Sequence, residues 1–298
     1  MAKVLVATEK PFHPKGVEKI KEIYNNAGAE WELTLLEKYP DKSQLLEAVK
    51  DAEAIIVRSD KITQEIIDAA PNLKIVVRAG AGYDNVDTEA ASAKNVVVMN
   101  TPGQNSNAVA ELAFCMMTYF ARNKLDASQG TELRGKKLGI HAYGNVGRYV
   151  AEIGKGFGME VYAYDPFVPK DLMEKDGVKS LPREDLLYKT CQFISLHVPS
   201  NEKTRGGINF NLMNSMPEHA VLVNTARKEV INDDFYYLSD IAPNCKDELE
   251  SKYPDRVLFT PKKMGAQTVE ANMNAAEAAA NQIINYFESG DVTFQVNK

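Results

Sequence analysis

The stretch LGIHAYGNVG at residues 138–147 decides the fold of this chain. It reads as an apolar strand that runs into a turn of small residues, with a helix expected from Asn145. Such a turn places a pyrophosphate at the helix N-terminus, where free backbone amides and the positive end of the helix dipole favour it. The usual G-x-G-x-x-G pattern starts here with Ala142, whereas Gly144 permits close approach of the phosphate and Gly147 permits close packing of the helix on the strand. The stretch therefore predicts a dinucleotide-binding α/β domain, although two glycines can also make a tight turn without any ligand.

Asp165 adds a second part of the same fingerprint. It ends the next expected strand, about twenty residues further on, where an acidic residue binds the ribose of a dinucleotide. Its carboxylate accepts hydrogen bonds from the 2′-hydroxyl and repels a 2′-phosphate. The sequence therefore predicts NAD as the cofactor, in preference to NADP.

Strand and helix patterns alternate on both sides of this stretch. Short β-branched runs, typical of strands buried on both faces, are expected at residues 4–7, 53–57, 74–77 and 96–99. Helical patterns lie at residues 15–27, 43–50, 63–70, 87–93, 105–122 and 269–289. A second series of strands is expected at residues 137–143, 160–165, 192–198, 220–226 and 257–261, and the tail at 292–296 is a further candidate. This alternation predicts parallel sheets with right-handed crossovers.

Composition limits the classes of protein and partner. The 298 residues suffice for two domains, and 44% hydrophobic with 26% charged residues is typical of a soluble globular protein. A net charge of −6 argues against nucleic acid as the main partner. Cys115, Cys191 and Cys245 form no metal-ligand spacing and no disulfide framework, which favours a reducing cytoplasm. The charged start of the chain is unlike a secretory signal, and the longest apolar stretch, residues 108–121, contains Glu111, so no membrane contact is expected.

Eight motifs, taken in order, resemble those of the D-2-hydroxyacid dehydrogenase family along nearly the whole chain. They are VRS at residues 57–59, RAGAGYDNVD at 78–87, NTPGQNSNAVAEL at 100–112, the fingerprint, YDPF at 164–167, SLHVP at 195–199, VLVNTAR at 221–227 and GAQTVEAN at 265–272. The VRS and RAG segments are most similar to the D-3-phosphoglycerate dehydrogenase branch.

The resemblance implies two α/β domains, each a doubly wound parallel sheet. Residues 1–99 and 270–298 would form a flavodoxin-like substrate-binding domain, and residues 100–269 a Rossmann domain that binds the dinucleotide. The resemblance also implies a homodimer formed through the cofactor domain, although the segment after Arg122 is shorter than the family's usual arm. The regulatory domains of longer members, and with them feedback by serine, are expected to be absent.

The resemblance further implies how a hydroxy acid is held and oxidised. Arg227 matches the family's catalytic arginine, whose guanidinium fork fits carboxylate and carbonyl oxygens. The family's base is a histidine, but the segment TPKKMGA at 260–266 has none and is one residue longer. Counting back from Gly265 places Lys263 at the position of the base, which we favour, and counting forward from the proline places Lys262 there. Two solvated loop lysines are the alternative.

The remaining candidates are carried over from the family motifs. The expected cofactor-binding residues are Asn107, Gly144, Asn145, Val146, Gly147, Asp165, His197, Val198, Pro199, Thr204, Thr225, Ala226, Asp240 and Gly265. The expected substrate-binding residues are Arg58, Ser59, Arg78, Ala79, Gly80 and Ala81. The last three are expected to hold the substrate carboxylate through backbone amides, and Arg58 and Arg78 to contact a phosphate, unless they pair with Asp60 or Asp84 on the surface.

Two departures concern the histidines and the family's glutamate. His141 is expected to pack against the sheet, and His197 to line the cofactor site through its backbone. The glutamate that orients the family's histidine has no clear counterpart, because its position falls near Cys245. A lysine base needs no tautomer fixed, so the loss of both residues together is coherent.

Three functions remain open on these grounds. The first is NAD-dependent oxidation of D-3-phosphoglycerate to 3-phosphohydroxypyruvate, as in serine biosynthesis. The second is a dehydrogenase or reductase of an unphosphorylated 2-hydroxy acid such as glycerate or glyoxylate. The third is a catalytically silent NAD-binding regulator, which loss of the histidine and glutamate favours and retention of Arg227 opposes.

Overall fold

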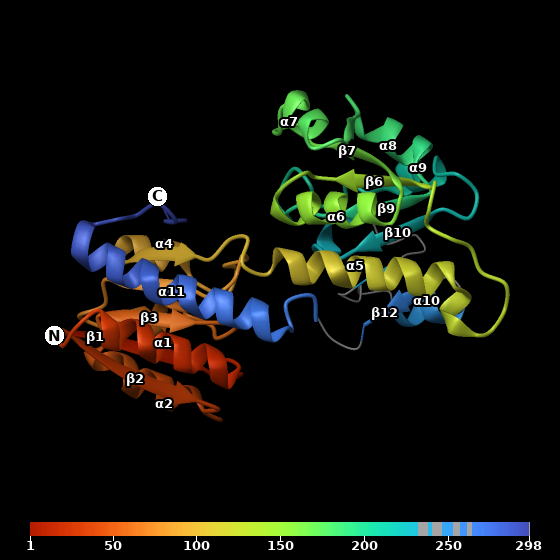
Figure 1. Cartoon of the computed structure of the whole chain (residues 1–298). Coiled ribbons are helices and arrows are strands. Elements are labelled where there is room, and N and C mark those ends of the chain that lie inside the picture. Colours follow the sequence, from red (N-terminus) through yellow and green to blue (C-terminus); the bar gives the residue numbers. More distant parts are fainter. Residues whose placement is uncertain (232–237, 240–245, 253–256, 261–263, 298) are drawn as a thin grey trace. The chain divides into compact units, whose positions relative to one another are not determined.

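A computed structural model of the chain describes residues 1–231, 238–239, 246–252, 257–260 and 264–297. It divides into two compact units, Met1–Asn105 with Gln267–Lys298 as unit 1, and Ser106–Ala266 as unit 2 (Figure 1). In the described part of the chain, no helix is long and apolar enough to span a membrane.

Unit 1 is a five-stranded parallel sheet in the order β2-β1-β3-β4-β5. Its strands are β1 (Ala2–Thr8), β2 (Trp31–Glu37), β3 (Ala54–Val57), β4 (Ile75–Arg78) and β5 (Val97–Asn100). Its helices are α1 (Pro14–Asn26), α2 (Lys42–Ala48), α3 (Gln64–Asp68), α4 (Thr88–Ala93) and α11 (Val269–Ser289), with the 3-10 turn η1 (Val49–Asp51). This order is the flavodoxin-like one, so the expected fold class of this unit is confirmed.

Two apolar layers cover the sheet of unit 1. One forms between the sheet and helices α1 and α11, which lie side by side in Figure 1. In this layer Gly16 of α1 faces Ala276 of α11, and a Cβ at Gly16 would lie 3.5 Å from the Ala276 side chain. The other layer forms with α2, α3 and α4. Small residues therefore let the last helix of the chain pack against the first.

Strand β2 was not expected from the sequence. Its partly buried Leu33 and Leu35 alternate with the exposed Glu32 and Thr34, because β2 is the edge strand and faces solvent on one side. The candidate strand in the tail is reduced to one antiparallel bridge, Met99 with Gln295.

Unit 2 is a seven-stranded parallel sheet in the order β12-β11-β10-β9-β6-β7-β8. Its strands are β6 (Lys137–His141), β7 (Glu160–Tyr164), β8 (Lys179–Ser180), β9 (Phe193–Leu196), β10 (Val221–Asn224), β11 (Leu238–Ser239) and β12 (Leu258–Phe259). Its helices are α5 (Ser106–Ala121), α6 (Asn145–Gly156), α7 (Lys170–Lys175), α8 (Glu184–Thr190), α9 (Phe210–Asn214) and α10 (Lys246–Lys252), with 3-10 turns η2 (Asn123–Leu125) and η3 (Lys228–Val230). The order is that of the Rossmann fold with one further strand, as expected.

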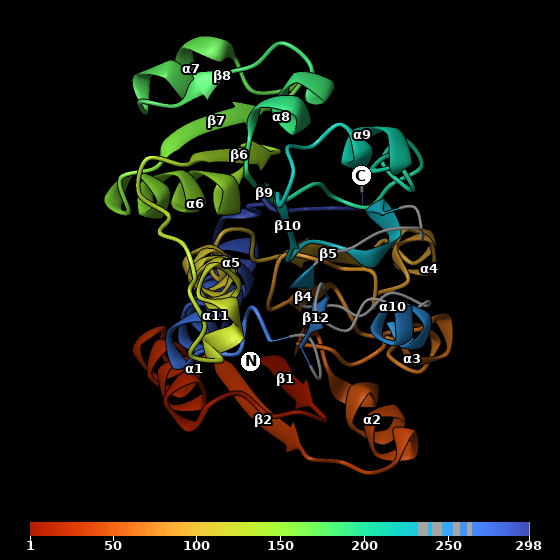
Figure 2. The same ribbon diagram turned by 90° about the vertical axis from the view of Figure 1, so that its right-hand side faces the viewer.

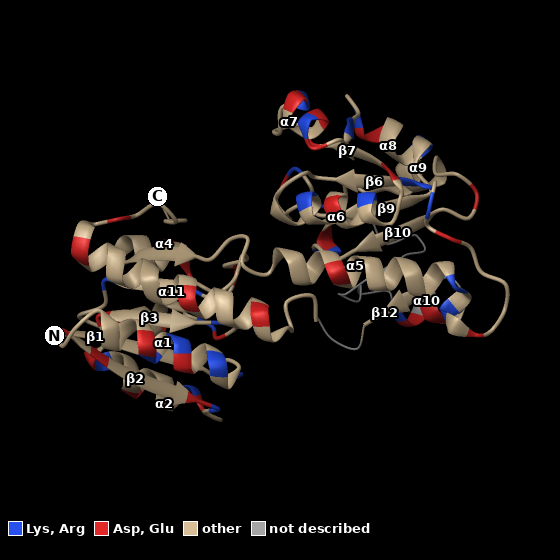
Figure 3. Cartoon of the chain, in the orientation of Figure 1, with Lys and Arg blue, Asp and Glu red and all other residues tan. Residues whose placement is uncertain are grey.

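The sheet of unit 2 is buried on both faces. Helices α5 and α6 cover one face and α8 and α9 the other, each with its own apolar core (Figure 2). Strands β9 and β10 carry no charged residue, and the charges of this unit lie mainly on helices and loops (Figure 3). Burial on both faces explains why these strands read as continuous apolar runs.

Candidate active site

The candidate cofactor site lies at the carboxyl edge of the sheet in unit 2. From β6 the chain continues to β7 and β8 on one side, and then returns to β9 on the other. His141 at the end of β6 pairs in register with Leu196 of β9, which pairs with Asn224 of β10. The three following loops, which contain most of the expected cofactor residues, therefore leave the sheet at one edge and at the point where strand order reverses. Open α/β sheets bind ligands at this switch point.

The fingerprint turn leaves the N-terminus of α6 free of side-chain caps. Ala142 adopts a left-handed conformation, with φ of 78°, where the usual pattern has glycine. Gly144 is the N-cap residue of α6, and no side chain caps this helix. A Cβ at Gly144 would meet nothing within 4 Å, whereas a Cβ at Gly147 would lie 2.4 Å from the Ala142 carbonyl oxygen. Gly147 is thus required by the fold, while the open space at Gly144 and the uncapped N-terminus of α6 fit a phosphate.

Asp165 holds this turn in place. Its Oδ2 accepts a hydrogen bond from the Tyr143 amide at 2.8 Å, and its Oδ1 accepts from the amides of Phe167 and Val168 at 2.8 and 3.2 Å. The Tyr143 hydroxyl donates to Asp176 at 3.0 Å, and burial raises the pKa of that tyrosine above its ordinary range. Oδ1 already accepts two hydrogen bonds, but Oδ2 accepts only one and can accept a second, so a ribose hydroxyl still fits at Asp165.

Two histidines lie behind the loops at this edge. The Nδ1 atom of His141 lies 3.1 Å from the Tyr188 hydroxyl. The His197 amide donates to the His141 carbonyl at 2.9 Å, and its buried Nε2 has no partner among the described residues. Burial lowers the pKa of His141 to about 4 and that of His197 to about 3. Both imidazoles are therefore neutral near pH 7.

The loop after β10 presents Arg227. The Asn224 side chain accepts the Ala226 amide at 3.0 Å and donates to the Arg227 carbonyl at 2.9 Å. Nη1 of Arg227 donates to the Ala226 carbonyl at 3.0 Å. Thr225 is buried, and its hydroxyl is without a partner in the described ranges. The side chain of Asn224 thus shapes the turn from which Arg227 projects.

Two other expected cofactor residues hydrogen-bond within their own segments, and some of the expected residues lie outside the described ranges. Thr204 donates to the Pro199 carbonyl and closes the turn after β9, and Asn107 on α5 donates to Glu111 at 2.7 Å. Gly265 is buried. The residues that fall outside the described ranges are Asp240, Cys245, Lys262 and Lys263.

The candidate substrate site lies at the corresponding edge of unit 1. Strand order reverses there between β1 and β3, so the loops at residues 9–12 and 58–60 leave the sheet at its switch point. Nη1 of Arg58 donates to the carbonyls of Pro11 and Lys10 at 2.9 and 3.4 Å, and its guanidinium lies 5.3 Å from the centre of the Phe12 ring. Arg58 is thereby fixed by main-chain and aromatic groups, and no ion pair with Asp60 is formed.

Arg78 and the following loop are packed tightly. Nε of Arg78 donates to the Arg58 carbonyl at 2.9 Å, and its guanidinium covers Gly80, where a Cβ would lie 1.6 Å from Nη1. The Ala79 amide is already donated to the Val57 carbonyl, and the Gly80 amide to the Arg78 carbonyl. Of the three amides expected to hold the substrate carboxylate, those of Ala79 and Gly80 already donate to carbonyls within the protein.

Sequence reasoning missed the buried polar residues beneath Arg58. Asp60 is only 4% exposed and binds the Tyr39 hydroxyl and the Glu9 amide. Asn85 donates to the Asp60 carbonyl at 2.7 Å. The only local signal is an aspartate three residues after the end of β3, and the sequence suggests for it only the alternative of a surface ion pair with an arginine.

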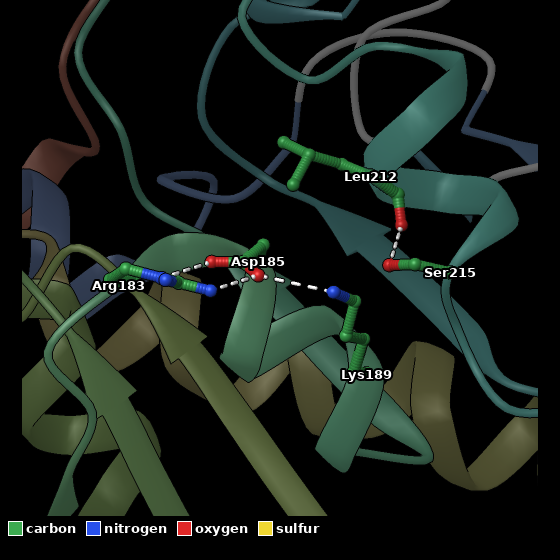
Figure 4. Close-up of polar contacts among 5 residues, drawn as sticks. All are labelled: Arg183, Asp185, Lys189, Leu212 and Ser215. Atoms are coloured by element: carbon green, nitrogen blue, oxygen red, sulfur yellow. Dashed lines mark hydrogen bonds and ion pairs between the residues drawn. The ribbon is translucent and has the colours of Figure 1, made fainter.

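A further group of cations in unit 2 does not form an anion site. Asp185 accepts from Nε and Nη2 of Arg183, both at 2.8 Å, and from Lys189 at 3.2 Å (Figure 4). The Arg183 hydrogen bonds hold the pKa of Asp185 at about 2. Both cations are thus paired with the same carboxylate, and the Ser215 hydroxyl donates to the Leu212 carbonyl at the end of α9.

Comparisons with known proteins show the family of the chain. Residues 4–297 match the profile of the D-isomer specific 2-hydroxyacid dehydrogenase family, catalytic domain. The D-3-phosphoglycerate dehydrogenase of Methanocaldococcus jannaschii is 35% identical, over 95% of this chain and 57% of that protein. The hydroxypyruvate reductase of Thermotoga maritima is 36% identical, over 80% of this chain and 86% of that protein.

One solved structure is similar over the full length. It is the cofactor (NAD+) bound 3-phosphoglycerate dehydrogenase of Entamoeba histolytica, which is 44% identical with a TM-score of 0.89. The match covers 100% of this chain and 99% of that one. The chain spans little more than half the length of the archaeal relative.

Proposed function

The chain belongs to the D-isomer specific 2-hydroxyacid dehydrogenase family, and we propose that it oxidises D-3-phosphoglycerate to 3-phosphohydroxypyruvate with NAD. The observation that supports a phosphorylated substrate is the fixed position of Arg58, whose guanidinium donates to main-chain carbonyls at the switch point of unit 1. A preorganised guanidinium suits a phosphate monoester, because its planar fork forms two parallel hydrogen bonds with oxyanions. The relatives named D-3-phosphoglycerate dehydrogenase support the same substrate.

NAD, when bound, supplies the acceptor for the hydride on C2 of the substrate. The uncapped amides of α6 beyond Gly144 would hold its pyrophosphate, since a Cβ at Gly144 meets nothing and the space there is open. Oδ2 of Asp165 would accept from a ribose hydroxyl, and its charge would exclude a 2′-phosphate. Selectivity for NAD over NADP follows from that carboxylate.

Arg227 and Lys263 would carry the chemistry. Arg227 clamps the substrate carboxylate and the oxygen on C2, and so orients the carbon that loses its hydride. Lys263 takes the hydroxyl proton on its neutral amine as the carbonyl forms. A lysine has an ordinary pKa of about 10.4, so oxidation should accelerate as the pH rises above neutral.

A second candidate function has one specific observation in its favour. The hydroxypyruvate reductase of Thermotoga maritima is 36% identical, close to the 35% of the Methanocaldococcus jannaschii D-3-phosphoglycerate dehydrogenase, and it matches over more of its own length than that dehydrogenase does. Reduction of an unphosphorylated 2-oxo acid would use the same clamp, with the lysine ammonium as the acid. The two functions differ in what Arg58 contacts.

The experiment measures NADH formation from NAD with 3-phosphoglycerate and, separately, with glycerate. We expect kcat/KM to be at least about tenfold higher for the phosphorylated acid, because one charged bidentate contact is worth roughly 1.5–3 kcal/mol. Equal values would favour the second function, and NAD binding without turnover of either acid would favour a silent regulator.

The matched pair Lys263→Ala and Lys262→Ala tests the base. Lys263→Ala should lower kcat by about a hundredfold or more with little change in NAD affinity, and Lys262→Ala should be near normal. The reverse pattern would place the base at Lys262. We also propose a cytoplasmic homodimer that associates through unit 2.

A further inference from the structure

Asp60 is a buried carboxylate in a loop that would otherwise be an ordinary strand-to-helix turn. Only 4% of it is exposed. Its Oδ1 accepts hydrogen bonds from the Glu9 amide at 2.6 Å and from the Tyr39 hydroxyl, while its buried Oδ2 has no partner in the part of the chain that the structure describes. Burying a charged group is costly unless it is fully hydrogen-bonded. A carboxylate with one unpaired oxygen is therefore a poor choice at this position for stability alone.

The hydrogen bonds of Asp60 reach the elements that surround Arg58. The Glu9 amide begins the loop at residues 9–12, and the carbonyls and the Phe12 ring of that loop hold the Arg58 guanidinium. On the other side, the Asn85 side chain donates to the Asp60 carbonyl at 2.7 Å and to the Arg58 carbonyl at 3.4 Å. Asp60 thus ties the β1, β2 and β4 segments to the turn that starts with Arg58.

This arrangement leaves one edge of the Arg58 guanidinium for a ligand. Nη1 is used by the carbonyls of Lys10 and Pro11. Nε and Nη2 donate to no acceptor in the described ranges. These two nitrogens form the fork that binds an oxyanion with two parallel hydrogen bonds. Burial lowers the pKa of Arg58 and the negative charge of Asp60 opposes that effect.

We propose that Asp60, hydrogen-bonded to the Glu9 amide and the Tyr39 hydroxyl, is a positioning residue that presents the Nε–Nη2 edge of Arg58 to the phosphate of the substrate. The proposal rests on the proposed function for the identity of that anion. Asp60 itself does not touch the substrate and acts through the loop at residues 9–12.

The test compares Asp60→Ala, Asp60→Asn and Tyr39→Phe in the full chain. We expect Asp60→Ala to raise the KM for 3-phosphoglycerate about tenfold or more, with kcat and the KM for glycerate changed by less than about twofold. Asp60→Asn should be largely rescued, because its remaining carbonyl oxygen can accept from both donors. Tyr39→Phe, which loses one hydrogen bond, should raise the KM a few-fold.

A matched control separates positioning from loss of a buried hydroxyl. Tyr24 is also buried in unit 1, and its hydroxyl has no hydrogen-bond partner in the described residues. Tyr24→Phe should leave both KM values unchanged. An equal increase in KM for Tyr24→Phe and Tyr39→Phe, or equal increases for both acids with Asp60→Ala, would overturn the proposal.

A crystal structure of Asp60→Ala, or of Tyr39→Phe if that variant does not fold, decides the claim independently of turnover. The Arg58 guanidinium should have left the Pro11 carbonyl, and an unmoved guanidinium would overturn the proposal. If the wild type does not oxidise 3-phosphoglycerate, the proposed function fails. The position of the Arg58 guanidinium in the crystal structure then still tests the positioning role of Asp60.

Discussion

Helices α1 and α6 each follow the first strand of their sheet, yet their N-termini differ. In α1 the first residue is Pro14, which has no amide hydrogen, and the His13 side chain accepts the Lys15 amide at 3.3 Å. In α6 the N-cap residue is Gly144, and no side chain caps the helix. The α1 terminus is therefore satisfied by its own chain, whereas the α6 terminus keeps amides for a ligand.

The comparison shows that topology and turn chemistry play separate roles. Both sheets reverse strand order beside their first strand, and this reversal is where doubly wound sheets bind ligands. Unit 2 offers amides there, which suit a pyrophosphate spread along a backbone. In unit 1 the N-terminus of α1 is capped by its own chain, and the group available at the edge is the guanidinium of Arg58, which suits a single oxyanion.

The largest expected difference between the units is their response to acid. The pKa of His141 falls from 6.5 to about 4 on folding because the side chain is buried. Between these values the unfolded chain binds a proton that the folded chain does not. The free energy of unfolding is therefore complete above about pH 6.5 and decreases as the pH falls to about 4, by roughly 2–3 kcal/mol for this residue.

Trp31, the single tryptophan, lies in unit 1 and allows the two units to be distinguished. In urea titrations at about pH 4.5, circular dichroism should detect early unfolding of unit 2, before Trp31 fluorescence changes. His141→Gln should reduce the gap between the two transitions. Equal acid shifts of both signals would show that the buried histidines do not set the difference.

Gly147→Ala should destabilise unit 2 and prevent normal cofactor binding. The added Cβ would lie 2.4 Å from the Ala142 carbonyl oxygen, which belongs to the backbone and cannot move cheaply. Overpacking of this kind costs roughly 1–3 kcal/mol. Gly156→Ala on the same helix is the control, because its Cβ would meet nothing within 4 Å. Thermal unfolding of both variants measures the effect, and equal stabilities would contradict the close approach.

Gly144→Ala should separate binding from folding. Its Cβ enters open space, so the free energy of unfolding should change by less than about 1 kcal/mol. The same methyl group would occupy the place of a phosphate, and the Kd for NAD should rise by about tenfold, equivalent to 1.4 kcal/mol. Calorimetric titration with NAD measures it. Unchanged affinity would mean that the pyrophosphate does not lie at this turn.

His13→Ala should have the smallest effect, and only on stability. Loss of an N-cap acceptor costs about 1 kcal/mol, which should appear in the urea transition of Trp31. NAD affinity should stay normal, because the amides of the α1 terminus are satisfied by their own chain and hold no ligand. A weakened affinity for NAD would contradict the assignment of ligand binding to the α6 terminus alone.

The sequence predicted the two sheets but missed one strand, and both outcomes have a physical reason. The two parallel α/β sheets follow from apolar runs, since strands buried on both faces must be apolar throughout. Strand β2 was missed because an edge strand exposes alternate residues such as Glu32 and Thr34, which weakens its apolar pattern. The assigned roles of Arg227, Lys263 and Arg58 remain predictions.

The sequence by itself determined the fold class, the family and the chemistry of the fingerprint turn. These features depend on residues that are close in the chain, such as Ala142, Gly144 and Gly147, whose effects are local. Only the tertiary structure decided that Asp60 is buried against Glu9 and Tyr39, which lie 51 and 21 positions away. An aspartate after a strand has the same local pattern whether it faces solvent or a neighbouring loop. Which of these environments it occupies depends on how distant segments pack, and no short stretch of sequence contains that information.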